Sequence, residues 1–291
     1  GLSFMNKGIL LALSGYLIWG CFPIYWALLN HVNPSEVLVH RMLWSVPVLF
    51  FLVYSKPSWR LNFKESLSSR KELLFLLITA ILITINWGGY ILAVNLGRVV
   101  EASMGYFLSP VLNMIGGYVF FHERISKLKQ LAVLFATVGA LFYVFSGDSF
   151  PWLGFLVGFT FSAYGIARKA MSSQAVPGLY IETLILLPFF LVFSIWFYSN
   201  FDVSFFNVDI STDILLFLAG AVTVIPLALF NAGAKLLPMT TVGVLFLITP
   251  TLQFLVGYYL QNEAVNTNQL IGFVGVWTGL IMYSYGLIKD K

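Results

Sequence analysis

Few side chains that could take part in chemistry interrupt the long apolar stretches of this sequence. Glu36, His40 and Arg41 come together at the start of one stretch, and the four-residue spacing of Glu36 and His40 puts both on one helix face. A guanidinium can hold a carboxylate through two hydrogen bonds, and an imidazole titrates near neutral pH. We therefore expect Arg41 to bind an anion, with gating or proton coupling at Glu36 and His40. A structural ion pair at the helix end, with Arg41 extended outward, is the alternative.

A second pair of opposite charges lies in the second half of the chain. Glu182 falls about one turn inside an apolar stretch, and Arg168 closes the stretch before it. A contact between them would join two neighbouring helices, so Arg168 and Glu182 are candidates for a second gate. A solvated salt bridge, which contributes less than about 1 kcal/mol, is equally consistent with the sequence.

Amide and aromatic side chains well inside the apolar stretches are candidates for a binding pocket. A buried amide needs a hydrogen-bonding partner, and aromatic rings with polar groups suit a planar or apolar molecule. Each aromatic could instead be ordinary core, because such residues are abundant here. The predicted substrate-binding residues are Trp19, Arg41, Asn86, Tyr90, Tyr106, Asn113, Tyr164 and Gln253.

Motifs for metal, nucleotide or covalent chemistry are missing from the sequence. His122-Glu123 resembles the start of a zinc-protease motif, but Ser126 stands where the second His would be. There is no Gly-x-x-x-x-Gly-Lys-Ser/Thr loop and no Cys/His cluster, and Cys21 is the single cysteine. We expect no cofactor, no metal and no catalytic residue.

The composition indicates which environment must surround the elements that position these residues. The 291 residues are 59% hydrophobic and 10% charged, whereas soluble proteins carry about 25% charged residues. Lipid must therefore be the main solvent. The net charge of +4 is spread between apolar stretches, which argues against a nucleic-acid partner.

Apolar stretches bounded by charge, Pro, Gly or Asn predict ten transmembrane helices. They cover residues 8–29, 35–54, 73–95, 102–121, 128–146, 152–170, 178–198, 212–233, 241–260 and 267–287. With a cytoplasmic N-terminus, 14 of the 16 basic residues, Lys291 included, fall on the cytoplasmic side. Cytoplasmic loops are enriched in Lys and Arg, so the sequence predicts a multi-pass protein of the bacterial inner membrane with both termini in the cytoplasm.

An internal repeat predicts how these helices are organised. Residues 110–123 align without gaps with 250–263, with Pro, Leu, Gly, Tyr and Glu coinciding, from Pro110 and Pro250 to Glu123 and Glu263. Five helices in each copy reverse the direction of the second one. The predicted fold is therefore an all-α membrane protein of two inverted five-helix repeats, residues 1–147 and 148–291, an organisation typical of transporters.

The order of several short motifs resembles that of a known family. They are Tyr16-Leu-Ile-Trp-Gly20, His40-Arg41, Asn86-Trp87, 101–107 (Glu-Ala-Ser-Met-Gly-Tyr-Phe), 122–124 (His-Glu-Arg), Tyr164-Gly165, Arg168-Lys169, 181–183 (Ile-Glu-Thr) and Leu187-Pro188. Over almost the whole chain, the sequence resembles the EamA-type transporters of the drug/metabolite transporter superfamily, within them the RarD-like, chloramphenicol-sensitivity group. The resemblance implies a ten-helix inner-membrane carrier with a central cavity for small metabolites.

Together these observations favour a secondary transporter of a small metabolite or drug-like molecule that works by alternating access at a midplane cavity. Export is the direction that the resemblance implies. A facilitator or exchanger of amino acids or other metabolites, without proton coupling, is an alternative. A membrane-embedded lipid-processing enzyme is another, although it would need clustered polar residues near one interface. The expected partners are a small-molecule substrate and the lipid bilayer, and the sequence leaves the oligomeric state open.

Overall fold

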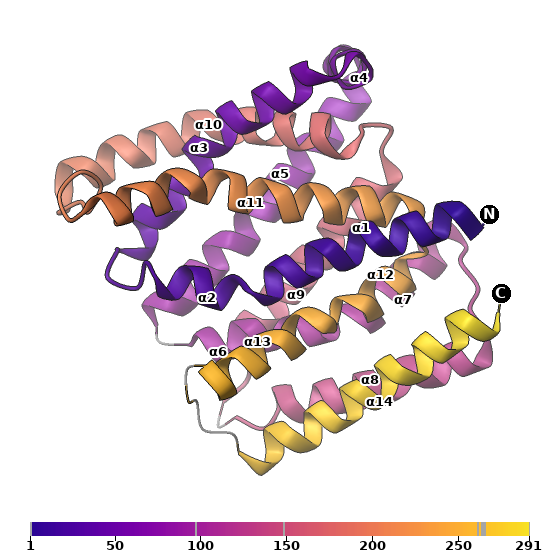
Figure 1. Ribbon diagram of the computed structural model, residues 1–291. Helices are drawn as coiled ribbons and strands as arrows, with labels where there is room; N and C mark the ends of the chain where they lie inside the picture. The colour runs from indigo at the N-terminus through magenta and orange to yellow at the C-terminus, as the bar shows by residue number, and fades with distance from the viewer. Residues whose placement is uncertain (1, 97, 148, 261, 263–265, 291) are drawn as a thin grey trace.

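The structure, a computed structural model, describes residues 2–96, 98–147, 149–260, 262 and 266–290, and these residues form helices and short connections (Figure 1). Asp148, Glu263 and Lys291, which enter the predictions above, lie outside the described residues. In chain order the helices are α1 (Leu2–Gly20), α2 (Phe22–Ala27), α3 (Pro34–Ser55), α4 (Pro57–Ser68), α5 (Arg70–Asn95), α6 (Val99–Met104), η1 (Gly105–Leu108), α7 (Ser109–Phe121), α8 (Lys127–Val144), α9 (Trp152–Ala170), α10 (Ala175–Asn200), α11 (Ile210–Leu236), α12 (Met239–Phe246), α13 (Ile248–Leu260) and α14 (Thr267–Lys289).

Long apolar helices form because lipid offers no hydrogen bonds to the backbone, so a helix must satisfy its own N–H and C=O groups. Among the described residues, eight helical segments are long and apolar enough to cross a membrane. Large apolar side chains such as Phe51, Ile195 and Ile281 remain exposed on them, as expected of a lipid-facing surface. The prediction of a helical multi-pass membrane protein is confirmed. These segments match eight of the ten predicted spans. Of the remaining two predicted spans, one corresponds to α9 and the other to the interrupted segment α6–η1–α7, whose apolar part Gly105–Phe121 is shorter than the eight segments.

The basic connection after α3 contains a helix that the hydropathy pattern does not predict. Pro57 starts α4, as its fixed backbone angle allows at the first helical turn. The buried face of α4 contacts the turn between α9 and α10: Asn62 Oδ1 accepts from the Gln174 N–H at 2.8 Å, and the hydroxyls of Ser66 and Ser173 are 2.9 Å apart. These contacts join distant segments, so local sequence carries little sign of them.

Structural boundaries recur at the 140-residue spacing of the sequence repeat. The α6–η1–α7 segment begins at Val99 and α12 at Met239, while α8 begins at Lys127 and α14 at Thr267. The residues at the ends of α7 and α13 match too, because His122 and Asn262 both have φ of 53°. Before α8 and α14, Ser126 and Asn266 each accept a hydrogen bond from the N–H three residues on. Matched turns and caps indicate that the two halves fold alike locally.

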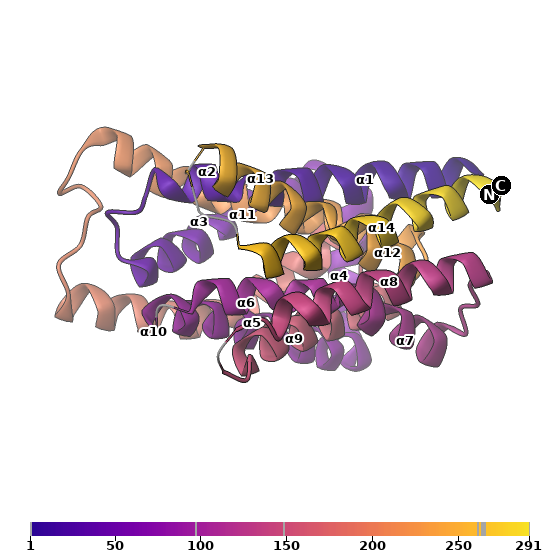
Figure 2. The same ribbon diagram turned by 90° about the horizontal axis from the view of Figure 1, so that it is seen from below.

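Two helices pack closely at one edge of the bundle. In Figures 1 and 2, α8 and α14 lie side by side, far from α3 and α10. Their backbones approach through glycine: a Cβ added at Gly139 would lie 2.6 Å from the Gly272 carbonyl oxygen. The first turn of α1 and the last turn of α14 lie at the same end of the bundle in both views. An even number of membrane crossings would place them so.

Two carboxylates outside the spans stabilise helix ends. Asp209 Oδ1 accepts from the Thr212 N–H at 2.7 Å at the start of α11, and this bond lowers the pKa of Asp209. Asp290 Oδ2 lies 2.8 Å from Lys129 Nζ after α14, and this contact lowers the pKa of Asp290. Both remain ionised at neutral pH and serve as caps or surface ion pairs.

Candidate functional site

Arg41 points into the protein from α3 and is held there by aromatic rings and a hydroxyl. Its Nε donates to Thr223 Oγ1 of α11 at 2.9 Å. The guanidinium carbon lies 4.9 Å from the centre of the Trp26 ring and 6.0 Å from that of Trp87. Two aromatic faces stabilise a cation without neutralising its charge. The predicted alternative, an arginine extended outward to the membrane surface, does not describe this geometry.

Arg41 has no acidic partner among the residues that the structure describes. Its Nε is engaged by Thr223, whereas its two terminal nitrogens could donate further hydrogen bonds. The hydroxyls of Tyr90 and Tyr106 come near enough to interact electrostatically with the guanidinium. The structure therefore brings two of the predicted binding residues, Tyr90 and Tyr106, near the predicted anion-binding cation Arg41.

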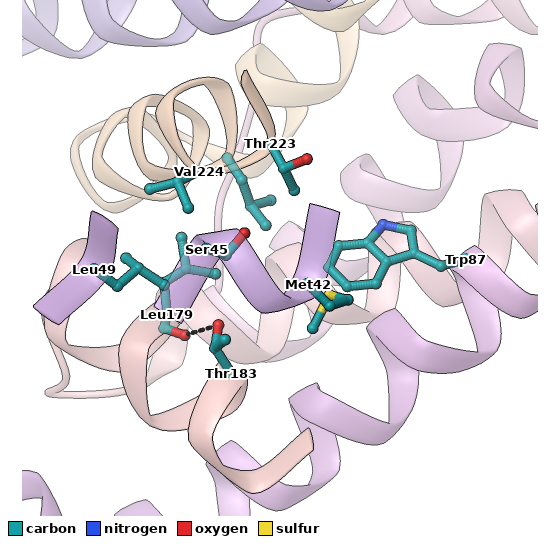
Figure 3. Close-up of a pocket in the computed structure, with 9 residues that line it drawn as sticks. Met42, Ser45, Leu49, Trp87, Leu179, Thr183, Thr223 and Val224 are labelled. Atoms are coloured by element: carbon teal, nitrogen blue, oxygen red, sulfur yellow. Dashed lines mark hydrogen bonds between the residues drawn. The ribbon is translucent and has the colours of Figure 1, made fainter. Parts of the chain in front are cut away.

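A small cavity lies between α3, α5, α10 and α11 (Figure 3), and its lining includes Thr223 and Trp87, which contact Arg41. Its volume is about 10 Å³, which is room for about one water molecule. Its wall is largely apolar, with the hydroxyls of Ser45, Thr183 and Thr223 as polar groups. Their protons are engaged by backbone carbonyls: Thr183 donates to Leu179 at 2.8 Å and Thr223 to Ala219 at 2.8 Å. The hydroxyls therefore present acceptor lone pairs, and the positive charge comes from Arg41.

Aromatic side chains form a cluster between α1, α9, α11 and α12. Trp19 lies 5.7 Å from Phe161 and 5.6 Å from Phe230 between ring centres, and Tyr106 lies 5.6 Å from Phe161. The Tyr106 hydroxyl donates to Asn86 Oδ1 at 3.4 Å. Tyr106 thus connects the surroundings of Arg41 with the aromatic cluster.

Three predicted amide residues occupy different surroundings. Asn86 Nδ2 donates to the Val157 carbonyl at 2.8 Å, and Gln253 Nε2 donates to the Trp19 carbonyl at 3.0 Å. Asn113 is buried against α12 beside Gly243, and among the described residues its Oδ1 has no hydrogen-bond partner. Asn86 and Gln253 therefore join helices in this conformation, whereas Asn113 keeps a free acceptor.

The predicted gating residues of α3 contact the α10–α11 connection. Glu36 is fully buried, and its carboxylate accepts from the N–H groups of Ser204 at 2.9 Å and Phe205 at 3.0 Å. His40 Nε2 lies 2.8 Å from the Tyr198 hydroxyl and 3.9 Å from Glu36 Oε1. These contacts hold one end of the bundle together.

The second predicted pair meets near the other end of the bundle. Arg168 Nε lies 3.5 Å from Glu182 Oε1, and both side chains are almost fully buried. Tyr164 donates to the same carboxylate oxygen at 3.1 Å and accepts from Asn231 Nδ2 at 3.0 Å. The predicted contact between Arg168 and Glu182 is present, and burial makes it unlike a solvated surface pair.

Several contacting residues were not found by sequence reasoning. Trp26 and Thr223 surround Arg41, yet Thr223 is 182 positions away in the chain and its type is common in membrane helices. Glu72 accepts from the Ser172 and Ser173 N–H groups at 3.1 and 3.0 Å, and Glu123 accepts from the Met239 N–H at 2.9 Å. An acidic residue at a helix end was the available signal, but its partners depend on the fold.

Comparisons with known proteins agree with this arrangement of apolar helices around buried polar groups. The EamA-like transporter family matches residues 6–145. The chain is 33% identical to the uncharacterized transporter YojE of Bacillus subtilis, over 98% of this chain and 96% of that protein. It is 34% identical to the protein RarD of Escherichia coli, over 96% of this chain and 94% of that protein. The chain therefore belongs to the EamA-like transporter family and is a multi-pass membrane protein, which confirms the resemblance.

A solved structure supports the fold independently. A protein of known crystal structure matches with a TM-score of 0.74 and covers 96% of this chain and 98% of its own length. The two sequences are 14% identical, so this likeness concerns the fold alone.

Proposed function

We propose that this protein is a secondary transporter that carries a small amphipathic molecule by alternating access between two inverted five-helix repeats, residues 1–147 and 148–291. The recurrence of helix starts, caps and left-handed residues at a spacing of 140 supports two equivalent halves. Inverted repeats provide two similar packings of one chain, and a site between them can face either side in turn.

The observation that carries the proposal is the partly buried side chain of Arg41, whose guanidinium has aromatic and hydroxyl neighbours but no acidic partner among the described residues. A charge within a membrane-spanning helix is costly and normally faces a functional cavity. A substrate with a carboxylate would supply the missing charge and accept two hydrogen bonds. Once the enclosing helices move apart, the apolar cavity wall and Trp87 would contact its planar or apolar part.

Two sets of contacts would act as gates on either side of this site. Glu36 and His40 hold α3 to the α10–α11 connection, while Arg168 and Glu182 hold α9 to α10. Opening one set while the other stays closed would expose Arg41 to one side of the membrane. The distribution of basic residues supports a bacterial inner-membrane location in which the termini and the Arg168 end face the cytoplasm. Family analogy favours export.

A ligand-binding experiment tests the substrate site. Purified protein is heated with amino acids, chloramphenicol and aromatic carboxylic acids, and the unfolding temperature is recorded. A carboxylate ligand should raise it, because ligands that bind the folded state stabilise it. Arg41→Ala should abolish that rise, and Arg41→Lys should retain only part of it, since lysine lacks the two-pronged geometry.

The matched control is Arg60→Ala, which removes an exposed arginine and should leave the rise unchanged. A rise that persists in Arg41→Ala would show that Arg41 is structural. Any ligand found is then used in liposomes containing the protein, where a carrier gives saturable uptake and counterflow. Linear, unsaturable flux would contradict the transporter mechanism.

A further inference from the structure

A buried polar network joins α9, α10 and α11 on the side of the bundle away from the Arg41 cation. Arg168 and Glu182 are each about 1% exposed, and Tyr164 and Asn231 are buried beside them. Glu182 Oε1 receives the Tyr164 hydroxyl at 3.1 Å and lies 3.5 Å from Arg168 Nε. Buried ion pairs are stable when both partners are fully hydrogen-bonded, so the remaining atoms matter.

Several atoms of this network have no hydrogen-bond partner among the described residues. They are Nε and Nη1 of Arg168, Oε2 of Glu182 and Oδ1 of Asn231. Thr79 of α5 lies beside the carboxyl group, but its hydroxyl donates to the Leu76 carbonyl at 3.1 Å. Among the described residues, Glu182 Oε2 therefore receives no hydrogen bond, and the Thr79 hydroxyl oxygen could accept one from a protonated carboxyl group.

Arg168 is anchored independently of Glu182. Its Nη2 donates to the Gln174 carbonyl at 3.3 Å and to the Ala175 carbonyl at 3.0 Å. Gly178 makes room for the guanidinium, because a Cβ at this position would overlap Arg168 Nη1. The cation also lies in the last turn of α9, where the helix dipole favours positive charge. Loss of the negative charge on Glu182 would therefore leave Arg168 in place.

We propose that Glu182 is a proton-binding site: Oε2 takes up a proton from water, the ion pair with Arg168 is lost, and the neutral acid donates to a neighbouring oxygen. Release of the proton restores the pair and tightens the contact between α9 and α10. The charged group that faces Glu182 is Arg168 on α9. Lys235 on α11 interacts in turn with Arg168, with Glu72 on α5 and with Lys169 on α9. Within the described residues, α3 and α4 place no charged side chain within ion-pair distance of Glu182.

Lys235 and Glu72 have partners of their own. Lys235 Nζ donates to the carbonyls of Arg168 and Met171 at 3.1 and 2.6 Å. Glu72 accepts from Ser173 through its N–H at 3.0 Å and its hydroxyl at 2.5 Å. A carboxylate with several donors stays ionised, so Glu72 differs from Glu182 although both are buried acids on neighbouring helices.

This inference rests on the proposed function only in that Arg168 and Glu182 form one of the two proposed gates. Proton binding itself can be measured without any substrate. Purified full-length protein in lipid is titrated while the infrared carbonyl band of protonated carboxylic acids is recorded. We expect the band of one buried acid to change between acidic and alkaline pH. Its band should disappear in Glu182→Gln and persist in the control Glu72→Gln.

A second variant keeps the test valid if Glu182→Gln does not fold. Tyr164→Phe removes the hydroxyl that donates to the carboxylate and should move the titration midpoint upward by roughly one pH unit. A wild-type protein with no titrating buried acid, or a band unchanged in Glu182→Gln, would overturn the proposal. The result leaves the transport proposal untouched, because that proposal depends on Arg41 and on flux.

Discussion

Ionisable side chains in the apolar helices of this protein are fixed by specific partners. Glu36, Glu72 and Glu123 each accept backbone N–H groups from a segment far away in the chain. Hydrogen bonds to an ionised group are stronger than neutral ones, so each carboxylate holds two segments together. Arg41 differs, because aromatic rings and one hydroxyl surround it. This contrast separates residues that stabilise the bundle from the residue that would bind substrate.

Glu36→Gln should destabilise the protein by about 1–2 kcal/mol, because an amide oxygen accepts the Ser204 and Phe205 N–H groups more weakly than a carboxylate. Thermal unfolding of purified protein would show this as a lower midpoint. Glu65→Gln, at an exposed position of α4, is the matched control and should leave the midpoint unchanged. Equal midpoints for wild type and Glu36→Gln would contradict the role of Glu36.

The sequence indicates some of these residues but not their partners. Arg41 and Glu182 could be predicted because a charge within an apolar stretch is costly and needs a reason. Trp26 and Thr223 could not, since only the three-dimensional packing brings them to Arg41. Asn86 and Gln253 were predicted on the same grounds as Asn113, yet the first two donate to carbonyls of neighbouring helices. Residue type alone does not distinguish a helix-joining amide from a binding one.

The helices are held at close distances by small residues rather than by apolar burial. Lipid chains are as apolar as Leu, so close van der Waals packing and hydrogen bonds drive helix association in membranes. The crossing of α8 and α14 shows this, because Gly139 lies against the backbone of Gly272, Gly275 and Val276. The same contact involves the last helix of each predicted repeat.

Gly139→Ala should weaken the α8–α14 contact, because the added Cβ would lie 2.6 Å from the Gly272 carbonyl oxygen and 2.7 Å from the Val276 nitrogen. Overpacking of this kind costs about 1–3 kcal/mol. The control is Gly88→Ala in α5, where nothing lies within 4 Å of the added atom. That change should leave the unfolding temperature the same or raise it, since Ala favours helix. An equal effect of both substitutions would refute close backbone packing.

The hydropathy pattern predicts where the helices lie better than it predicts where they are interrupted. The predicted span 152–170 coincides with α9, and the span 35–54 differs from α3 by one residue at each end. The span 102–121 is instead divided among the end of α6, η1 and α7. Gly105 packs against the backbone of Gly154 there, a tertiary contact that an apolar average cannot indicate. Helix α4 was missed for a similar reason, since its partners lie in the α9–α10 turn.

In the whole molecule, the repeat and the placement of the ends are consistent with one another. Helix boundaries recur at a spacing of 140, and the described ends of α1 and α14 lie on the same side (Figure 2). The cavity beside Arg41 lies between helices of both sequence halves, α3 and α5 from the first and α10 and α11 from the second. A site shared by two halves is where rocking of one against the other would change access.

Alternating access requires that this cavity open to each side of the membrane in turn. Thiol labelling can measure this, because Cys21 is the single cysteine to be replaced. In a Cys21→Ser background, Ser45→Cys places a thiol in the cavity wall. Vesicles of either orientation are treated with a small anionic, membrane-impermeant methanethiosulfonate. Ser68→Cys and Asn207→Cys, at exposed positions on α4 and in the α10–α11 connection, serve as one-sided controls. We expect labelling of Ser45→Cys from both sides of the membrane and of each control from one side. Labelling of Ser45→Cys from a single side, or from neither, while the controls react, would contradict alternating access at this cavity.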